Sequence, residues 1–201
     1  MSTTKFAGLG CVVLVIIAVV VVALAGLGTY NRLVGLDESV NSAWAQVENV
    51  YQRRADLIPN LVETVKGAAD FEQETLNQVI EARSKVSQIN FDGPPDAAQM
   101  AQFQQAQGEL SSALSRLLVV VERYPELKAV DAFRDLQVQL EGTENRITVE
   151  RQRYNEVARE YNTARRRFPA ALFAGLFGFE EHAYFEAKEG ADTPPQVDFS
   201  D

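Results

Sequence analysis

The sequence has little of what most catalytic sites are built from. Its 201 residues include one histidine, His182, and one cysteine, Cys11. One histidine cannot form the two Glu-x-x-His pairs of a di-iron bundle, and one cysteine makes neither a thiolate zinc site nor an intrachain disulfide. No glycine-rich phosphate loop follows a strand pattern. We therefore expect no catalytic residue, no metal site and no cofactor, with His182 at a loop or tail surface.

Positive charge is also scarce. The chain carries 19 Lys and Arg residues against 28 Asp and Glu residues, a net charge of −9. Proteins that bind nucleic acid rely on cationic surfaces that neutralise phosphates. Nucleic acid is therefore not an expected partner.

Residues 6–28 lack both charge and proline. At about 1.5 Å per residue, a helix of this length reaches the roughly 30 Å of a bilayer core. A cleaved signal peptide has a shorter apolar core, of about 7 to 15 residues, so a membrane-spanning helix is the favoured interpretation. Lys5 and the α-amino group precede the run, and Arg32 follows it. The positive-inside rule then slightly favours a cytoplasmic N-terminus with the rest of the chain outside, and the opposite orientation is the alternative.

Strand patterns are nearly absent after this run, whereas apolar residues recur at helical spacing. The spacing predicts four helices: one continuing from the membrane run, a second from Asp70, a third from Asp96 and a fourth from about Glu126 to Arg167. Asp70 and Asp96 each begin a capping-box pattern. We expect an all-α fold, in which a transmembrane helix is followed by an antiparallel four-helix bundle with long first and fourth helices.

The chain divides into four parts on this interpretation. Residues 1–5 are an N-terminal flank, residues 6–28 the transmembrane helix, residues 29–169 the helical bundle, and residues 170–201 an apolar hook with an irregular C-terminal tail.

A charged residue interrupts the apolar seam of each long helix, Arg54 in the first and Glu150 in the fourth. If the two helices are antiparallel with Leu33 opposite Phe168, Arg54 lies opposite Ile147 and within one turn of Glu150. A charge that faces a bundle core is tolerated chiefly when it is paired. We expect a partly buried Arg54–Glu150 ion pair with a structural role.

Pro59 lies inside the apolar pattern of the first helix, and the pattern continues beyond it. Proline removes one helical hydrogen bond and displaces the carbonyl four residues earlier, here that of Ala55. Because the pattern continues, we expect a kink near Pro59 and not a helix end. A functional hinge is the alternative.

A basic and apolar segment, RRRFPAALFAGLFGF at residues 165–179, follows the fourth helix. It is too short to span a bilayer, but three arginines before an aromatic run are typical of a segment at an anionic membrane interface. The alternative is a hook that completes the core at the bundle end, and one segment can do both. If the helices run up, down, up and down from the membrane, the segment returns to it; if the first two form one rod, it lies far away. The contact residues on this interpretation are Arg165, Arg166, Arg167, Phe168, Phe173 and Phe177.

Three stretches of the sequence resemble the LemA family of bacterial membrane proteins. They are YNRLVGLDESVNSAWAQVENVYQRRADLIPNLVETVKG at residues 30–67, GTENRITVERQRYNEVAREYN at residues 142–162, and a tail of the form FGF…YFEA…VDF. The resemblance covers nearly everything after the membrane segment. It implies an N-terminally anchored, antiparallel helical bundle, and it carries over no reaction and no catalytic residue.

We therefore expect a single-pass protein of the bacterial cell membrane whose bundle is a scaffold or protein-interaction module. Its expected partners are the lipid bilayer and an unidentified membrane or envelope protein. A homo-oligomer is a further alternative, although no GxxxG motif in the membrane helix indicates a specific dimer. The alternative is a ligand-binding sensor that acts through the kinked first helix, and an enzyme is the least favoured hypothesis. A polar pocket would favour the sensor, and an exposed apolar patch would favour the scaffold.

Overall fold

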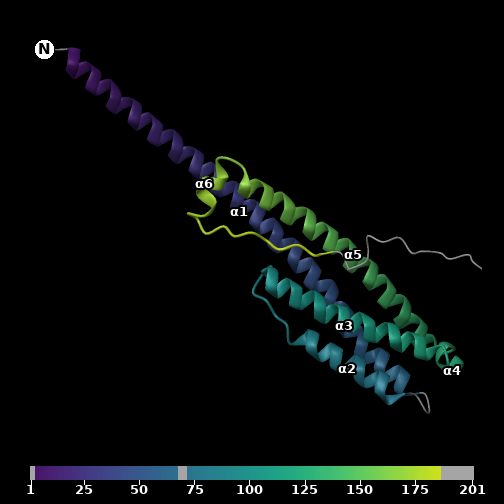
Figure 1. Cartoon of the computed structure of the whole chain (residues 1–201). Helices are drawn as coiled ribbons and strands as arrows, with labels where there is room; N and C mark the ends of the chain where they lie inside the picture. Colours follow the sequence, from purple (N-terminus) through teal and green to yellow (C-terminus); the bar gives the residue numbers. More distant parts are fainter. Residues whose placement is uncertain (1–2, 68–71, 187–201) are drawn as a thin grey trace, which may run out of the picture.

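The computed structural model describes residues 3–67 and 72–186, which form helices and connecting segments without a strand (Figure 1). The prediction of an all-α fold is confirmed for this part of the chain. Its helices are α1 (Thr3–Lys66), α2 (Gln73–Ser87), α3 (Ala97–Val121), α4 (Pro125–Lys128), α5 (Asp131–Arg166) and α6 (Ala170–Ala174).

The membrane segment and the first helix of the domain are one element. α1 runs for 64 residues without a break, and its N-terminal part projects beyond the other helices (Figure 1). The large apolar side chains between Val13 and Leu27 are exposed. Within the described residues, α1 is the one helix long and apolar enough to cross a membrane. This helix is consistent with a membrane location.

Helix α5 runs back along α1 (Figure 1). Leu33 packs with Ala164 near the N-terminal apolar run, and Arg54 pairs with Glu144 further along α1, so the two helices are antiparallel. Helices α2 and α3 are antiparallel too, as two ion pairs between them show. Lys85, near the end of α2, pairs with Glu109 in the middle of α3, whereas Glu72, just before α2, pairs with Arg123, just after α3.

Two apolar clusters fill the interior. The cluster nearer the N-terminal apolar run is aromatic, and it includes Trp44, Tyr51, Phe103, Tyr154 and Phe185. The distal cluster is mainly aliphatic and joins five helices, with members such as Ile58, Leu61, Leu76, Leu117 and Phe133. Burial of each such side chain stabilises the fold by about 1.5 to 3 kcal/mol. On α1 the two clusters meet between Tyr51 and Ile58, which is where Arg54 lies.

The helix ends agree with the predictions in one place and differ in another. Asp96 caps α3 and forms the expected capping box with Gln99. Asp70 lies outside the described residues, and α2 begins at Gln73. The predicted fourth helix is two helices, because α4 ends at Lys128 and the backbone is extended at Val130, the N-cap of α5. Asp131 in the first turn of α5 favours this new start, since a carboxylate there complements the helix dipole.

Pro59 lies within α1, and the helix continues past it to Lys66. Because proline has no N–H, the carbonyl oxygen of Ala55 loses its helical donor. Arg83 of α2 replaces that donor: its Nε donates to the Ala55 oxygen at 3.0 Å. The missing hydrogen bond thus becomes a contact between α1 and α2. The kink at Pro59 stays a prediction.

We expect Arg83→Met to lower the free energy of unfolding by about 1 to 2 kcal/mol, because the Ala55 oxygen loses a charged donor. In a Pro59→Ala background the new backbone N–H serves the same oxygen, so the cost of Arg83→Met should be smaller. Denaturant unfolding in mild detergent of the unmodified protein, the two single variants and the double variant gives the coupling energy between positions 59 and 83 as a double-mutant cycle. Strictly additive effects would contradict this account of the contact.

Candidate functional site

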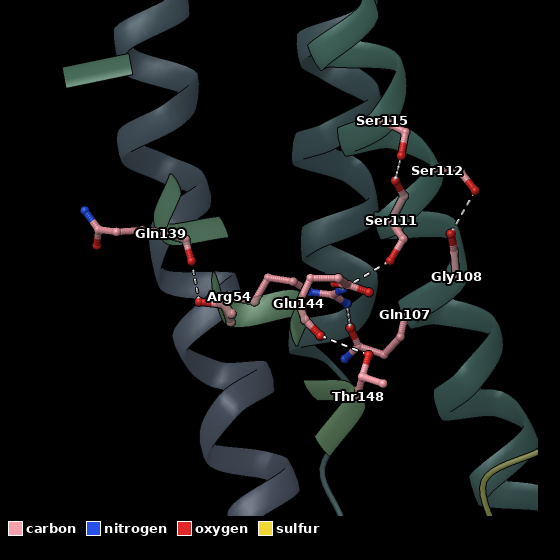
Figure 2. A network of polar contacts seen from close by, with 10 residues as sticks. Arg54, Gln107, Gly108, Ser111, Ser112, Ser115, Gln139, Glu144 and Thr148 are labelled. Atoms are coloured by element: carbon pink, nitrogen blue, oxygen red, sulfur yellow. Dashed lines mark hydrogen bonds and ion pairs between the residues drawn. The ribbon is translucent and has the colours of Figure 1, made fainter. Parts of the chain in front are cut away.

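Arg54 is the one charged residue among the buried residues of the described chain, with 2% of its surface exposed. Its guanidinium joins three helices (Figure 2). Nη1 donates to Glu144 Oε2 of α5 at 2.9 Å and to Ser111 Oγ of α3 at 3.1 Å, while Nη2 donates to Gln107 Oε1 of α3. The guanidinium also lies 5.1 Å from the ring centre of Tyr51. Its two terminal nitrogens are therefore occupied inside the protein.

The carboxylate that pairs with Arg54 is that of Glu144 and not the predicted Glu150. The register of α5 against α1 differs from the prediction by about one turn, because Leu33 packs against Ala164 instead of lying opposite Phe168. α5 ends at Arg166, before Pro169, and the residue before a proline is disfavoured in a helix. Phe168 therefore points outward instead of extending the seam.

Glu150 has a different environment. Its Oε2 lies 4.0 Å from Arg153 Nη1 on the same helix, and this buried oxygen has no hydrogen-bond partner. Arg53, next to Arg54, is exposed, as expected for the wetter side of α1. Asp56 accepts a hydrogen bond from Gln52 at 2.9 Å.

The network around Arg54 has the chemistry of a structural site. The side chain of Glu144 is 54% exposed, so water reaches the anion while the cation stays buried. In the described residues no group of three or more His, Cys, Asp or Glu side chains is placed to hold a metal ion. An arginine is always protonated and cannot serve as a general base. The arrangement fixes α1, α3 and α5 against one another where the two apolar clusters meet.

A groove with a volume of about 1550 Å³ lies over this network. Tyr51 and Arg54 of α1 contribute to its lining, and α5 contributes Glu144 and Arg151. Small and polar side chains of α3 line it as well, including Gln104, Gln107, Gly108, Ser111, Ser112 and Ser115, and residues 181–184 and Glu186 complete it. Polar groups from three helices and the C-terminal segment therefore converge on one open groove.

Asparagine side chains of α5 hold the C-terminal segment, residues 179–186. Asn162 binds the backbone of His182 on both sides, accepting from its N–H at 3.1 Å and donating to its carbonyl at 2.8 Å. Asn155 binds Phe185 in the same way, at 2.8 and 2.9 Å. The two asparagines are seven residues apart, about two helical turns, so they share one face of α5. An extended segment is thus attached through its backbone.

Phe185 anchors this segment in the aromatic cluster. Its ring stacks with that of Trp44 at a centroid distance of 6.1 Å and meets the ring of Tyr154 edge-on at 5.5 Å. The Arg151 guanidinium lies 4.6 Å from the centre of the same ring. A residue far along the chain from α1 therefore completes the core around Trp44.

His182 does not lie at a loop or tail surface as predicted. Its side chain is 16% exposed, and Nε2 lies 2.8 Å from Asp37 Oδ1 of α1. Its ring packs on Tyr161 with centroids 4.6 Å apart. Because Asn162 fixes the His182 backbone, the ring is directed toward α1 and ties the C-terminal segment to it.

Burial raises the pKa values of three tyrosines beside these contacts. It raises the pKa of Tyr161 to about 12, and it also raises the pKa of Tyr154. For Tyr51 burial raises the pKa, and the charges of Arg151 and Arg54 oppose that shift. These phenols stay protonated at neutral pH. The Tyr161 hydroxyl donates to the Glu180 carbonyl at 2.8 Å, whereas the buried Tyr154 hydroxyl has no hydrogen-bond partner among the described residues and its ring serves in packing.

The basic and apolar segment at residues 165–179 lies against the membrane end of α1 (Figure 1). Ala170 and Ala174 of α6 are buried with Leu33 and Ala164, so one side of the segment completes the core as a hook. The ring of Phe173 covers Gly26 so closely that an added Cβ would lie 3.4 Å from it. The chain therefore returns to the membrane run; the predicted alternative, in which this segment lies far away, is not observed.

The other side of this segment is not covered. Phe168, Leu172 and Leu176 are 83%, 67% and 78% exposed, and Arg166 and Arg167 are exposed as well. Arg165 is engaged: its Nε donates to the Phe179 carbonyl at 2.9 Å, and Nη1 lies 3.8 Å from Glu181. Phe177 packs edge-on against Tyr30 of α1 at 5.2 Å. The predicted contact residues thus gather where the domain meets the N-terminal apolar run of α1.

Comparison with known proteins shows the family of the chain. Magnetosome protein MamQ 2 of Paramagnetospirillum magneticum is 28% identical over 200 residues, which cover 90% of this chain and 74% of that protein. Magnetosome protein MamQ of Magnetospirillum gryphiswaldense is 28% identical over 84% of this chain and 70% of its own length. Protein LemA of Metamycoplasma hominis is 24% identical over 81% and 71%. The sequence model of the LemA family matches residues 43–199, most of the chain, and the protein therefore belongs to the LemA family.

Proposed function

We propose that this protein is a membrane-anchored scaffold, or protein-interaction module, of the bacterial cell envelope. Helix α1 is the observation that carries the proposal. Its large side chains are exposed between Val13 and Leu27 and buried at Leu33, Val40 and Trp44. Because one continuous helix crosses the bilayer and then packs in the core, it holds the domain directly at the membrane. Membership of the LemA family supports this reading.

The proposal includes the architecture of the anchored domain. Helices α1, α2, α3 and α5 form an antiparallel four-helix bundle in which α1 and α5 are the long members. The antiparallel contacts between α1 and α5, and between α2 and α3, support it. The orientation that we propose is a cytoplasmic N-terminus with the bundle outside, and the reverse orientation is the alternative.

The proposal assigns no reaction to the protein. Arg54 is the buried charge of the described residues, and its terminal nitrogens bind the protein's own Glu144, Ser111 and Gln107. A catalytic group needs hydrogen-bonding positions that are free to contact a substrate. The position of Arg54 between two apolar clusters suits a residue that sets helix register.

A ligand-binding sensor is the second candidate, and the groove favours it. Polar groups from α1, α3 and α5 converge there, and the Arg83 contact at Ala55 links α2 to α1 beside Pro59. Affinity capture from membranes separates the two candidates. Partners retained by the full chain and lost when residues 29–201 are removed support the scaffold; partners retained by residues 1–28 alone contradict it.

We expect the full-length protein to stay in the membrane pellet after washing with carbonate at high pH. The uncharged run at residues 6–28 is long enough to cross the bilayer as a helix, and such helices resist this wash. A chain that starts at residue 29 is the control and should be washed off. Release of the full-length protein would contradict the proposed anchorage.

A further inference from the structure

We propose that a surface beside α6 is a lipid-binding site that inserts into the headgroup layer of an anionic bilayer. The inference rests on the proposed function, since it requires α1 to cross that bilayer. The α6 surface consists of the exposed side chains of Phe168, Leu172, Leu176, Phe177, Arg166 and Arg167.

The α6 surface lies at the level where α1 leaves the membrane. The Phe173 ring covers Gly26, and the uncharged run ends at Gly28, about 3 Å further along the helix axis. Tyr30 follows, with its ring against Phe177 and Phe179 at 5.2 and 5.7 Å. Tyrosine is enriched at membrane interfaces, where its apolar ring and polar hydroxyl are both accommodated. The position of α6 along α1 is therefore that of an interfacial segment.

This segment buries its small side chains and exposes its large ones, the opposite of what is expected for a segment that packs on the core and otherwise faces water. Its buried members are the small residues Ala170 and Ala174, whereas the larger Phe168, Leu172 and Leu176 are exposed. Hydrophobic stabilisation grows with the apolar area that is buried, so a segment that served only the core would turn its large side chains inward. Exposed leucines and phenylalanines at this level indicate that another apolar phase covers them, and the bilayer next to α1 is that phase.

The charges beside the α6 surface favour anionic lipid. Arg166 and Arg167 are exposed next to it, in a chain whose net charge is −9. In the segment that follows, Glu181 lies beside Arg165, and Asp37 of α1 is bound to His182. Glu180 and Glu186 are the other exposed acidic residues of that segment. Two arginines at an interface contact headgroup phosphates and gain attraction from a negative surface potential.

A second attachment has a mechanical consequence. A helix that crosses the bilayer alone leaves the domain free to tilt and rotate about it. Insertion of the α6 surface adds a contact on one side of α1, which fixes the face of the bundle that is turned toward the membrane. The groove between α3 and α5 then has a defined orientation relative to the lipid surface.

Two positions of equal exposure allow a matched test. Leu172 beside α6 and Val138 on α5 are both 67% exposed, and Val138 is 28 residues before Arg166, about 42 Å along the helix. A nitroxide is attached to Leu172→Cys or Val138→Cys in a full-length Cys11→Ser chain, in vesicles of phosphatidylglycerol and phosphatidylcholine. We expect the label at residue 172 to collide with oxygen and to be shielded from a water-soluble nickel chelate, and the label at residue 138 to show the reverse. Equal access of the chelate to both labels would overturn the proposal.

The second arm tests the arginines. Shielding at residue 172 should be greater with phosphatidylglycerol than with phosphatidylcholine alone, and the double variant Arg166→Gln and Arg167→Gln should lose that difference. Shielding that does not depend on lipid charge in the unmodified chain would overturn the assignment of anionic headgroups. Trp44 emission checks that each variant is folded. Release by carbonate would instead disprove the proposed function, whereas a retained protein with a water-exposed label at residue 172 disproves this inference alone.

Discussion

Replacing Arg54 with alanine should lower the free energy of unfolding by about 3 to 5 kcal/mol. The substitution removes a side chain that fills space between the two apolar clusters, and long arginine stems contribute packing as well as charge. It also leaves the buried Gln107 oxygen without the donor it has in the structure. Denaturant unfolding in mild detergent, followed by the fluorescence of Trp44, measures the loss.

Neighbouring variants give this prediction its controls. Arg53→Ala removes the same side chain from the exposed side of α1 and should change the free energy of unfolding by no more than about 0.5 kcal/mol. Glu144→Gln should cost less than about 1 kcal/mol, because that carboxylate is half exposed and Arg54 keeps two other acceptors. Equal costs at positions 53 and 54 would show that Arg54 does not have the buried role assigned to it.

The position of Arg54 was readable from the sequence, but its partner was not. A gap in a regular apolar seam identifies the helix face and therefore the burial of Arg54. The partner depends on register: the sequence-based register set Arg54 opposite Ile147 and near Glu150, whereas a shift of about one turn sets it beside Glu144. Register was estimated by setting Leu33 opposite Phe168, just past the predicted helix end at Arg167, whereas α5 ends at Arg166. Small errors at helix ends thus become wrong contacts many residues away.

The contacts of the C-terminal segment were harder to predict. Asn155, Asn162 and Phe185 meet only because α5 and the segment lie side by side, and no local pattern specifies that pairing. One signal was available in the sequence, because two asparagines seven residues apart fall on one helix face. The structure buries Asn162 fully there. Buried amide side chains need partners, and an extended backbone supplies both a donor and an acceptor. Gln107 and Ser111 gave no comparable signal, since polar residues are common on helix surfaces.

The second large effect is expected at Phe185, whose side chain is buried with 5% of the residue exposed. Phe185→Ala should lower the free energy of unfolding by about 3 to 5 kcal/mol, because it leaves a cavity. If detaching residues 179–186 costs less free energy than keeping that cavity, the C-terminal segment should detach instead. Trp44 is the one tryptophan of the chain, and its ring stacks on Phe185. Loss of that contact admits water, so the emission of Trp44 should shift to longer wavelength under native conditions.

Phe168→Ala is the matched control, because it truncates the same residue type at a position that is 83% exposed. It should leave the emission of Trp44 unchanged. Asn155→Ala should produce the same red shift as Phe185→Ala to a smaller extent, since it removes both backbone bonds to Phe185 while the ring can still pack. If Phe185→Ala leaves both stability and Trp44 emission unchanged, the segment is not the element that closes the aromatic cluster. A red shift from Phe185→Ala and Asn155→Ala, and none from Phe168→Ala, would establish that backbone clamps on α5 and one aromatic anchor together hold the C-terminal segment in the core.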